Sequence, residues 1–270
     1  MLSEISSNTE VLVRLSSFVG LFALFAVWEL VVPRRTRQHS KSVRWLNNLA
    51  IMVLNGLIVR LAIPLAAVGT AVAAQNQNLG LLNIVEMPAV MAIVVAILAL
   101  DFILYLQHLV FHHVDFLWRL HRMHHADLDV DVTTGLRFHP IEIVLSMAIK
   151  MAAVLVLGAP VQAVIAFEVL LNASSLFNHA NIYIPEKVDR ILRYFIVTPD
   201  MHRVHHSVVR QETNSNFGFN VPWWDYLFRT YRAAPQAGQI GMNVGIEYFR
   251  TTRDLWLDHL LIQPFRKRTG

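Results

Sequence analysis

Residues 88–112 read PAVMAIVVAILALDFILYLQHLVFH, an apolar run that ends in two histidines four residues apart. The run is long enough to cross a bilayer as a helix. His108 and His112 would project from one face of that helix, and Asp101 lies two turns before His108 on the same face. The stretch therefore predicts a membrane-spanning helix that carries candidate metal ligands at its end.

The composition of the whole chain agrees with a membrane location. Of its 270 residues, 55% are hydrophobic and only 16% are charged, whereas a soluble domain has about 25% charged residues. This argues against a disordered chain and against an ordinary cytosolic enzyme. Cysteine is absent, which excludes disulfides, thiolate metal sites, iron–sulfur clusters and cysteine nucleophiles.

Three further apolar stretches extend the helical prediction. They cover residues 11–33, 45–74 and 141–177, and the last is broken by Gly158-Ala159-Pro160, which predicts a helical hairpin. Arg60 interrupts the second stretch, so a shorter crossing over residues 44–60 is an alternative. We predict an all-α polytopic membrane protein with about four to five transmembrane or re-entrant helices and a cytosolic histidine-rich helical cap.

The basic residues indicate the orientation of the chain. Five of the 23 Lys and Arg residues, with no acid among them, lie in one short loop: Arg34, Arg35, Arg37, Lys41 and Arg44. The positive-inside rule explains such a loop between two apolar spans better than a phosphate-binding patch does, so no nucleic-acid partner is expected. Residues 185–197 predict an amphipathic helix lying in the inner interface.

Histidine spacing is the main chemical signal of the chain. Among 13 histidines, the motif H-x-x-H-H occurs twice, as His121, His124, His125 and as His202, His205, His206. With His108 and His112 this makes eight motif histidines. They exceed what one ion binds and suit two metal ions, and imidazole suits zinc, copper, iron and nickel. Isolated axial ligands for a bis-histidine haem fit this clustering poorly.

Carboxylates and single histidines near these motifs are weaker candidates. Asp101 and Asp225 are expected to act on the ligands from outside the coordination sphere. His139 and His179 lie apart from the motifs, and each is either structural or a ligand.

The order of these motifs resembles the fatty acid hydroxylase / sterol desaturase superfamily of integral-membrane di-iron enzymes. The matching segments are residues 101–112, 117–125, 133–142, 179–181, 199–207, 216–218 and 224–228. The chain departs from the family pattern in two places. Ser175 stands where some members have a second histidine, so a ligand is missing or is supplied by His139, Asn178 or water. Arg229 replaces a glycine of the family tail, where we expect a different backbone or a contact with a lipid headgroup.

The resemblance implies one membrane-embedded domain over residues 1–270. It has transmembrane helices in 11–100, a catalytic region in 101–231 and a tail in 232–270. It implies two iron ions, for which zinc can substitute, with ten metal ligands: His108, His112, His121, His124, His125, His139, His179, His202, His205 and His206. Asp101, Asn181 and Asp225 are the expected catalytic residues.

The expected activity is hydroxylation or desaturation of a lipid C–H bond, in a fatty acyl chain or sterol, with O₂. Electrons are expected from a separate protein of the cytochrome b5 or ferredoxin type, because no cytochrome-b5-like segment is recognisable. Alternatives are an ether-lipid monooxygenase, a carotenoid hydroxylase, a zinc-binding membrane protein and a metal transporter. We expect a bacterial inner membrane, or the endoplasmic reticulum in a eukaryote, with the histidine boxes on the cytoplasmic side.

Overall fold

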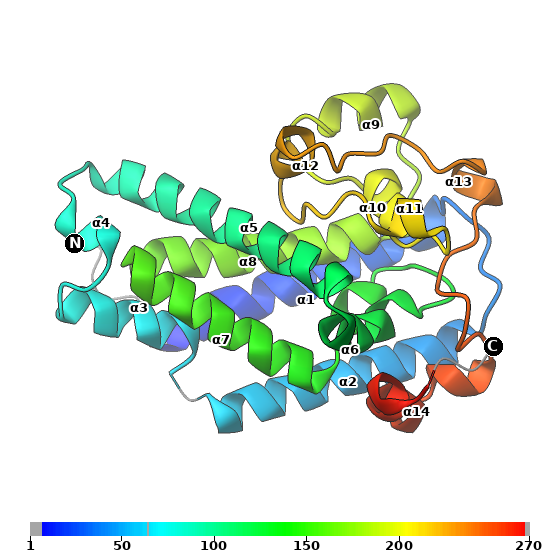
Figure 1. Ribbon diagram of the computed structural model, residues 1–270, viewed down its shortest axis with the longest axis horizontal. Coiled ribbons are helices and arrows are strands. Elements are labelled where there is room, and N and C mark those ends of the chain that lie inside the picture. Colours follow the sequence, from blue (N-terminus) through cyan, green and yellow to red (C-terminus); the bar gives the residue numbers. More distant parts are fainter. Residues whose placement is uncertain (1–6, 64, 268–270) are drawn as a thin grey trace.

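The computed structural model describes residues 7–63 and 65–267 and folds them into helices joined by loops. Six helices run along the long axis of the molecule and form a bundle (Figure 1). They are α1 (Ser7–Val31), α2 (Lys41–Ala62), α3 (Ala66–Asn76), α5 (Ala89–His113), α7 (Pro140–Leu157) and α8 (Val161–His179). The pairing within the described residues is limited to two isolated β-bridges, so the predicted all-α class is confirmed.

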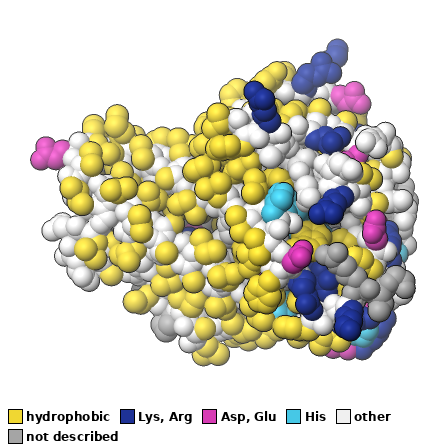
Figure 2. Space-filling model, in the orientation of Figure 1, with side chains coloured by type: hydrophobic (Ala, Val, Ile, Leu, Met, Phe, Trp, Pro, Cys, Tyr) yellow, Lys and Arg dark blue, Asp and Glu magenta, His cyan; other side chains and the backbone are white. Residues whose placement is uncertain are grey.

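Short helices form a cap at one end of this bundle (Figure 1). The cap contains α6 (Asp115–His125), α9 (Glu186–Leu192), α10 (Pro199–His205), α11 (Arg210–Thr213), α12 (Trp223–Leu227), α13 (Gly238–Gly241), α14 (Leu257–Ile262) and the 3₁₀ turns Thr134–Leu136, Thr252–Leu255 and Gln263–Phe265. The short α4 (Leu81–Ile84) lies at the opposite end. Lys and Arg side chains gather over the cap, whereas hydrophobic side chains cover the bundle (Figure 2).

Five segments of the described chain are long and apolar enough to cross a membrane. They are Val11–Val31, Lys41–Ile84, Ala89–His113, Pro140–Leu157 and Val161–His179. Large apolar side chains such as Leu61 and Val90 are 81% and 74% exposed on the bundle, which on helices of this length and hydropathy agrees with contact with lipid. The predicted four to five spans are confirmed, and the protein is an integral membrane protein.

The helix ends bear on two details of the predicted spans. Arg60 lies in the last turn of α2, which ends at Ala62, and α3 begins at Ala66, so the second apolar stretch forms two helices. The shorter crossing over residues 44–60 stays a prediction. The hairpin breaks at Gly158, which ends α7 in the left-handed conformation at φ 63°, where glycine has no steric penalty. A Cβ there would lie 2.6 Å from the Leu79 oxygen, so the turn also packs tightly against the loop before α4.

Small residues allow the helices of the bundle to approach closely. The core between α3, α5, α7 and α8 contains fully buried alanines at positions 67, 71, 96 and 163, with Leu100, Val154 and Phe167 filling the remaining space. Without a hydrophobic drive between helices in lipid, such small contacts favour association through close packing.

The basic loop binds the protein itself. Arg34 forms an ion pair with Asp200 at 2.9 Å, and the Arg35 guanidinium donates to the carbonyl oxygens of Gln239 and Met242. The loop that joins α1 and α2 is therefore fastened to the cap. Arg229 has a positive φ of 60°, a conformation that favours glycine, and its contact with a lipid headgroup stays a prediction.

Candidate metal centre

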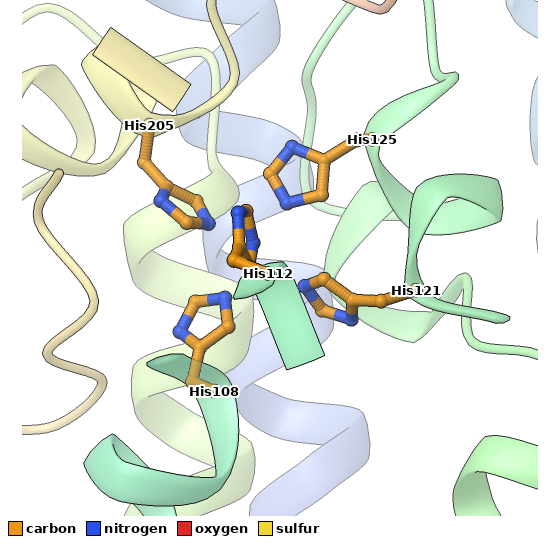
Figure 3. Close-up of side chains that lie close together, drawn as sticks. All are labelled: His108, His112, His121, His125 and His205. Atoms are coloured by element: carbon orange, nitrogen blue, oxygen red, sulfur yellow. The ribbon is translucent and has the colours of Figure 1, made fainter. Parts of the chain in front are cut away.

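Nine buried histidines form two adjacent clusters at the junction of bundle and cap. In the first are His108, His112, His121, His125 and His205; in the second are His124, His179, His202 and His206. Within each cluster one ring nitrogen per residue lies within 4.8 Å of those of the others. Figure 3 shows the first cluster, with rings from α5, α6 and α10 turned toward a common centre.

Helical spacing divides the H-x-x-H-H motif between the clusters. On α6, His121 and His125 are four residues apart and face the first cluster, while His124 faces the second. His205 and His206, where α10 ends, divide in the same way. The ring centroids of His125 and His206 are 4.6 Å apart. The two motifs therefore build two neighbouring sites.

Hydrogen bonds at the outer nitrogens orient four rings of the first cluster. The Nδ1 atoms lie 2.8 Å from the Phe217 oxygen for His108, 3.3 Å from Asn214 Oδ1 for His112, 2.7 Å from Glu142 Oε1 for His121 and 2.7 Å from the Ser215 oxygen for His205. The Nε2 atoms of these four are buried without a hydrogen-bond partner among the described residues. Carbonyl or carboxylate at one nitrogen and metal at the other is the usual arrangement of a ligating histidine.

The second cluster brings three Nε2 atoms even closer. His179 Nε2 lies 3.1 Å from His124 Nε2 and 3.0 Å from His202 Nε2, and its Nδ1 bonds the Ser175 oxygen at 2.7 Å. Neither nitrogen of His206 has a partner among the described residues. Imidazole nitrogens that converge in this number, several of them without a hydrogen-bond partner, fit a pair of metal ions. Iron, zinc, copper and nickel are all compatible with imidazole ligands.

The electrostatics favour neutral rings. Burial lowers the pKa of His205 to about 3. Burial, followed by the neighbouring histidines, holds the pKa values of His124, His125, His202 and His206 well below the usual range. Neutral imidazole is the form that binds a metal ion, so the site is in its ligating state at neutral pH.

His139 lies outside both clusters. Its Nδ1 accepts a hydrogen bond from the Ile141 amide at 3.2 Å, and its Nε2 lies 3.1 Å from the Leu261 oxygen. Both nitrogens are engaged in capping α7 and in holding α14, which contains Leu261. In place of the expected ligand role we assign His139 a structural one. His179, in contrast, lies in the second cluster as predicted.

The three expected catalytic residues also lie apart from the clusters. Asp101 accepts hydrogen bonds from Asn220 and Trp224, and the Asn181 amide bonds both backbone groups of Arg35. These contacts tie α5 and the loop after α8 to other segments. We therefore give both residues positioning roles.

Asp225 supports the first cluster through the backbone. Its carboxylate accepts from the amides of Phe217 and Gly218 at 2.8 and 2.7 Å, and Phe217 in turn presents its carbonyl to His108. Burial raises the pKa of Asp225 to about 6. We therefore propose that Asp225 acts from outside the coordination sphere, by holding the Phe217 carbonyl against the His108 ring.

Several supporting residues were not recognised as such from sequence. Glu142 and Asn214 bond cluster histidines, and Phe138 stacks on His124 with centroids 4.5 Å apart. Glu142 lay within a matched motif, three residues after His139, so an acid close to a histidine was a usable signal. Asn214 lies in a loop without a periodic pattern and gave none.

An apolar cavity of about 300 Å³ leads from the bundle to the metal centre. Side chains of α2, α5, α7 and α8 line it, and His108, His121 and His124 are at its inner end. A second, polar cavity of about 400 Å³ reaches His112 from the cap and includes Asp115 and Glu247 in its wall. The centre is thus accessible from an apolar and from a polar side.

The amino-acid sequence was compared with those of known proteins. The chain is 25% identical to ornithine lipid hydroxylase OlsE of Rhizobium tropici over 233 residues, which cover 84% of this chain and 69% of that protein. It is 28% identical to human alkylglycerol monooxygenase over 157 residues, 57% of this chain and 34% of the human protein. It is 26% identical to very-long-chain aldehyde decarbonylase GL1-4 of Oryza sativa subsp. japonica over 139 residues, 48% of this chain and 22% of that protein.

No solved structure matches the chain. Residues 93–230, half of its length, match the fatty acid hydroxylase family. The match includes all nine clustered histidines. The chain is therefore a member of the fatty acid hydroxylase family.

Proposed function

We propose that this protein is a membrane-bound di-iron oxygenase that uses O₂ and external electrons to oxidise a C–H bond of a lipid. The observation that carries the proposal is the pair of buried histidine clusters at the inner end of an apolar cavity. Bound iron would supply the redox chemistry that protein acids and bases lack. In hydroxylation, one atom of O₂ enters the C–H bond and the other leaves as water, with two electrons and two protons.

The residues of the chain would position the partners of this reaction. The nine clustered histidines would hold the metal ions, with zinc as a possible substitute, and Glu142 and Asn214 would fix the ring orientation of His121 and His112. Apolar walls such as Leu104 and Met147 would exclude water and receive the lipid chain from the bilayer.

The similarity to a lipid hydroxylase over 84% of the chain supports hydroxylation, and desaturation is the second outcome considered. Ether-lipid cleavage is supported by the match to a monooxygenase of alkylglycerols over 57% of the chain.

The proposal also covers the location of the protein and its electron donor. We place the clusters on the cytoplasmic side, because the basic loop is fastened to the cap through Arg34 and Asp200 and basic loops favour that side. A bacterial inner membrane is the proposed location, with the endoplasmic reticulum as the eukaryotic equivalent. The polar cavity at His112 suits delivery of protons near a docked electron donor of the cytochrome b5 or ferredoxin type.

Lipidomics of cells with and without the gene product tests the proposal. A lipid that gains one oxygen identifies hydroxylation, and one that loses two hydrogens identifies desaturation. The His124→Ala and His205→Ala variants should abolish the product and lower the bound iron. An unchanged lipidome together with metal transport by the wild type would contradict the proposal.

A further inference from the structure

Two buried oxygen atoms in the wall of the apolar cavity have no hydrogen-bond partner among the described residues. They are Asn55 Oδ1 on α2 and Glu142 Oε2 on α7. The two residues are 7% and 3% exposed, so they lie away from the outer surface of the protein. An unpaired buried acceptor is unfavourable by roughly 1–3 kcal/mol, and each such atom requires an explanation.

Asn55 Oδ1 can act only as an acceptor, and Glu142 Oε2 accepts when the carboxyl is ionised. The Asn55 amide donates through Nδ2 to the Phe138 carbonyl at 2.9 Å. Since a carbonyl cannot donate, the orientation of this amide is fixed and Oδ1 is the free end. Glu142 uses Oε1 for the His121 ring at 2.7 Å, which leaves Oε2.

Both atoms also lie beside the metal centre. Glu142 bonds a ligand of the first cluster. Asn55 bonds Phe138, whose ring stacks on His124 of the second cluster. Two residues of the cavity wall near the histidines therefore each carry an oxygen without a partner.

Besides these two oxygens, the cavity wall contains unpaired ring nitrogens of His108, His121 and His124, whereas other polar groups are paired. Gln107 donates to Ser146 at 2.9 Å, and Lys150 donates to Glu168 at 2.9 Å. The remaining wall is mostly apolar, with residues such as Leu104, Met147 and Phe167. Apart from the histidines, the buried unpaired polar atoms of the cavity wall, among the described residues, are thus those of Asn55 and Glu142.

We propose that Asn55 and Glu142 determine substrate specificity by accepting hydrogen bonds from an O–H or N–H group of the lipid, close to the carbon that is oxidised. This rests on the proposed function and narrows its substrate class to lipids that carry a hydroxyl, amide N–H or ammonium group near that carbon. A lipid whose polar atoms only accept would leave both oxygens unpaired.

The test measures binding by full-length, metal-loaded protein in nanodiscs, through the shift in unfolding temperature that each probe causes. The probes share a chain length: hexadecanol, N-methylhexadecanamide, protonated hexadecylamine and hexadecyl methyl ether. The wild type should bind at least one donor probe about tenfold more tightly than the ether, and the three donor probes distinguish hydroxyl, amide and ammonium. Ratios between variants cancel the different partitioning of the probes into lipid.

Matched variants make the result specific. Asn55→Leu should reduce the donor preference several-fold while the bound metal stays unchanged. Asn172→Leu, the same change elsewhere in the cavity wall, should keep the preference. In Glu142→Gln the amide oxygen would keep the bond to His121 and turn an N–H toward the cavity, so preference should move toward the ether.

Equal binding of all four probes by the wild type, or an unchanged preference in Asn55→Leu, would overturn the specificity proposal. Either result could occur while lipidomics still finds an oxidised lipid, in which case the proposed function would stand. An absent oxidation product with intact donor preference would instead count against the oxygenase and leave a binding site.

Discussion

Replacing Arg44 with leucine should uncouple α2 from the loop that follows His125 at the end of α6. Arg44 is fully buried, and its guanidinium bonds Asp127 at 2.6 and 2.9 Å and Asp131 at 2.5 Å. Burial raises the pKa of Asp127, but Arg44 and then Arg137 outweigh this and lower it below its usual range. Without Arg44, two buried carboxylates lose their principal counter-charge.

The expected loss in the free energy of unfolding follows from this geometry. Removing one partner of a buried ion pair typically destabilises by about 3–5 kcal/mol, a large part of the roughly 5–15 kcal/mol of a native protein. Asp127 lies two residues after His125, so the end of α6 should move and metal should be lost as well. Thermal unfolding in nanodiscs and metal analysis measure both effects.

Matched variants define the outcome that would refute this reasoning. Arg253 pairs with Asp258 at the surface, where the side chains are 53% and 59% exposed, and Arg253→Leu should leave stability nearly unchanged because water and salt screen such a pair. Adding Asp127→Asn to Arg44→Leu should restore part of the loss. If Arg44→Leu were as stable and as metal-rich as Arg253→Leu, the buried network would not hold the site.

Three further predictions concern the metal centre. Glu142→Ala should weaken metal binding about 10–100-fold in chelator competition, and unchanged affinity would show that the orienting bond to His121 is dispensable. Gly135→Ala would place a Cβ 2.5 Å from the Ser175 oxygen, which bonds the His179 ring; iron analysis should show depletion, and full loading would contradict the assigned packing. In metal-free protein the buried His205 ring has a pKa of about 3 in the folded state, against 6.5 in the unfolded state. Below pH 6.5 the unfolded state therefore binds more protons than the folded state. Stability should therefore fall as pH drops below 6.5, by up to about 1.4 kcal/mol per unit for each such group, and a flat unfolding temperature between pH 6.5 and 5 would contradict this.

The sequence predicted the elements of the fold better than their connections. Long apolar runs and Gly158 marked the spans and the hairpin, because length and local breakers act through neighbouring residues. The predicted helix over residues 185–197 forms only as Glu186–Leu192. The contact of Arg34 with Asp200 spans 166 residues, so no local pattern could reveal it.

The residues of the candidate site also differ in how far the sequence could predict them. Eight motif histidines were evident from spacing, since helical periodicity places them on shared faces, and all eight lie in the clusters. Sequence left the role of His139 open because a histidine before a helical proline is equally suited to capping, and its contact with Leu261 is a tertiary one. Backbone carbonyls such as that of Ser215 support the rings, and residue identity carries no signal for them.

The central claim is that the two clusters hold a pair of iron ions. Metal analysis of purified full-length protein, combined with iron X-ray absorption spectroscopy, tests it most directly. We predict two irons per chain with nitrogen ligation and a scattering contribution from a neighbouring iron, and loss of that contribution in His206→Ala. A single isolated metal per chain, or iron ligated by oxygen alone, would contradict the account.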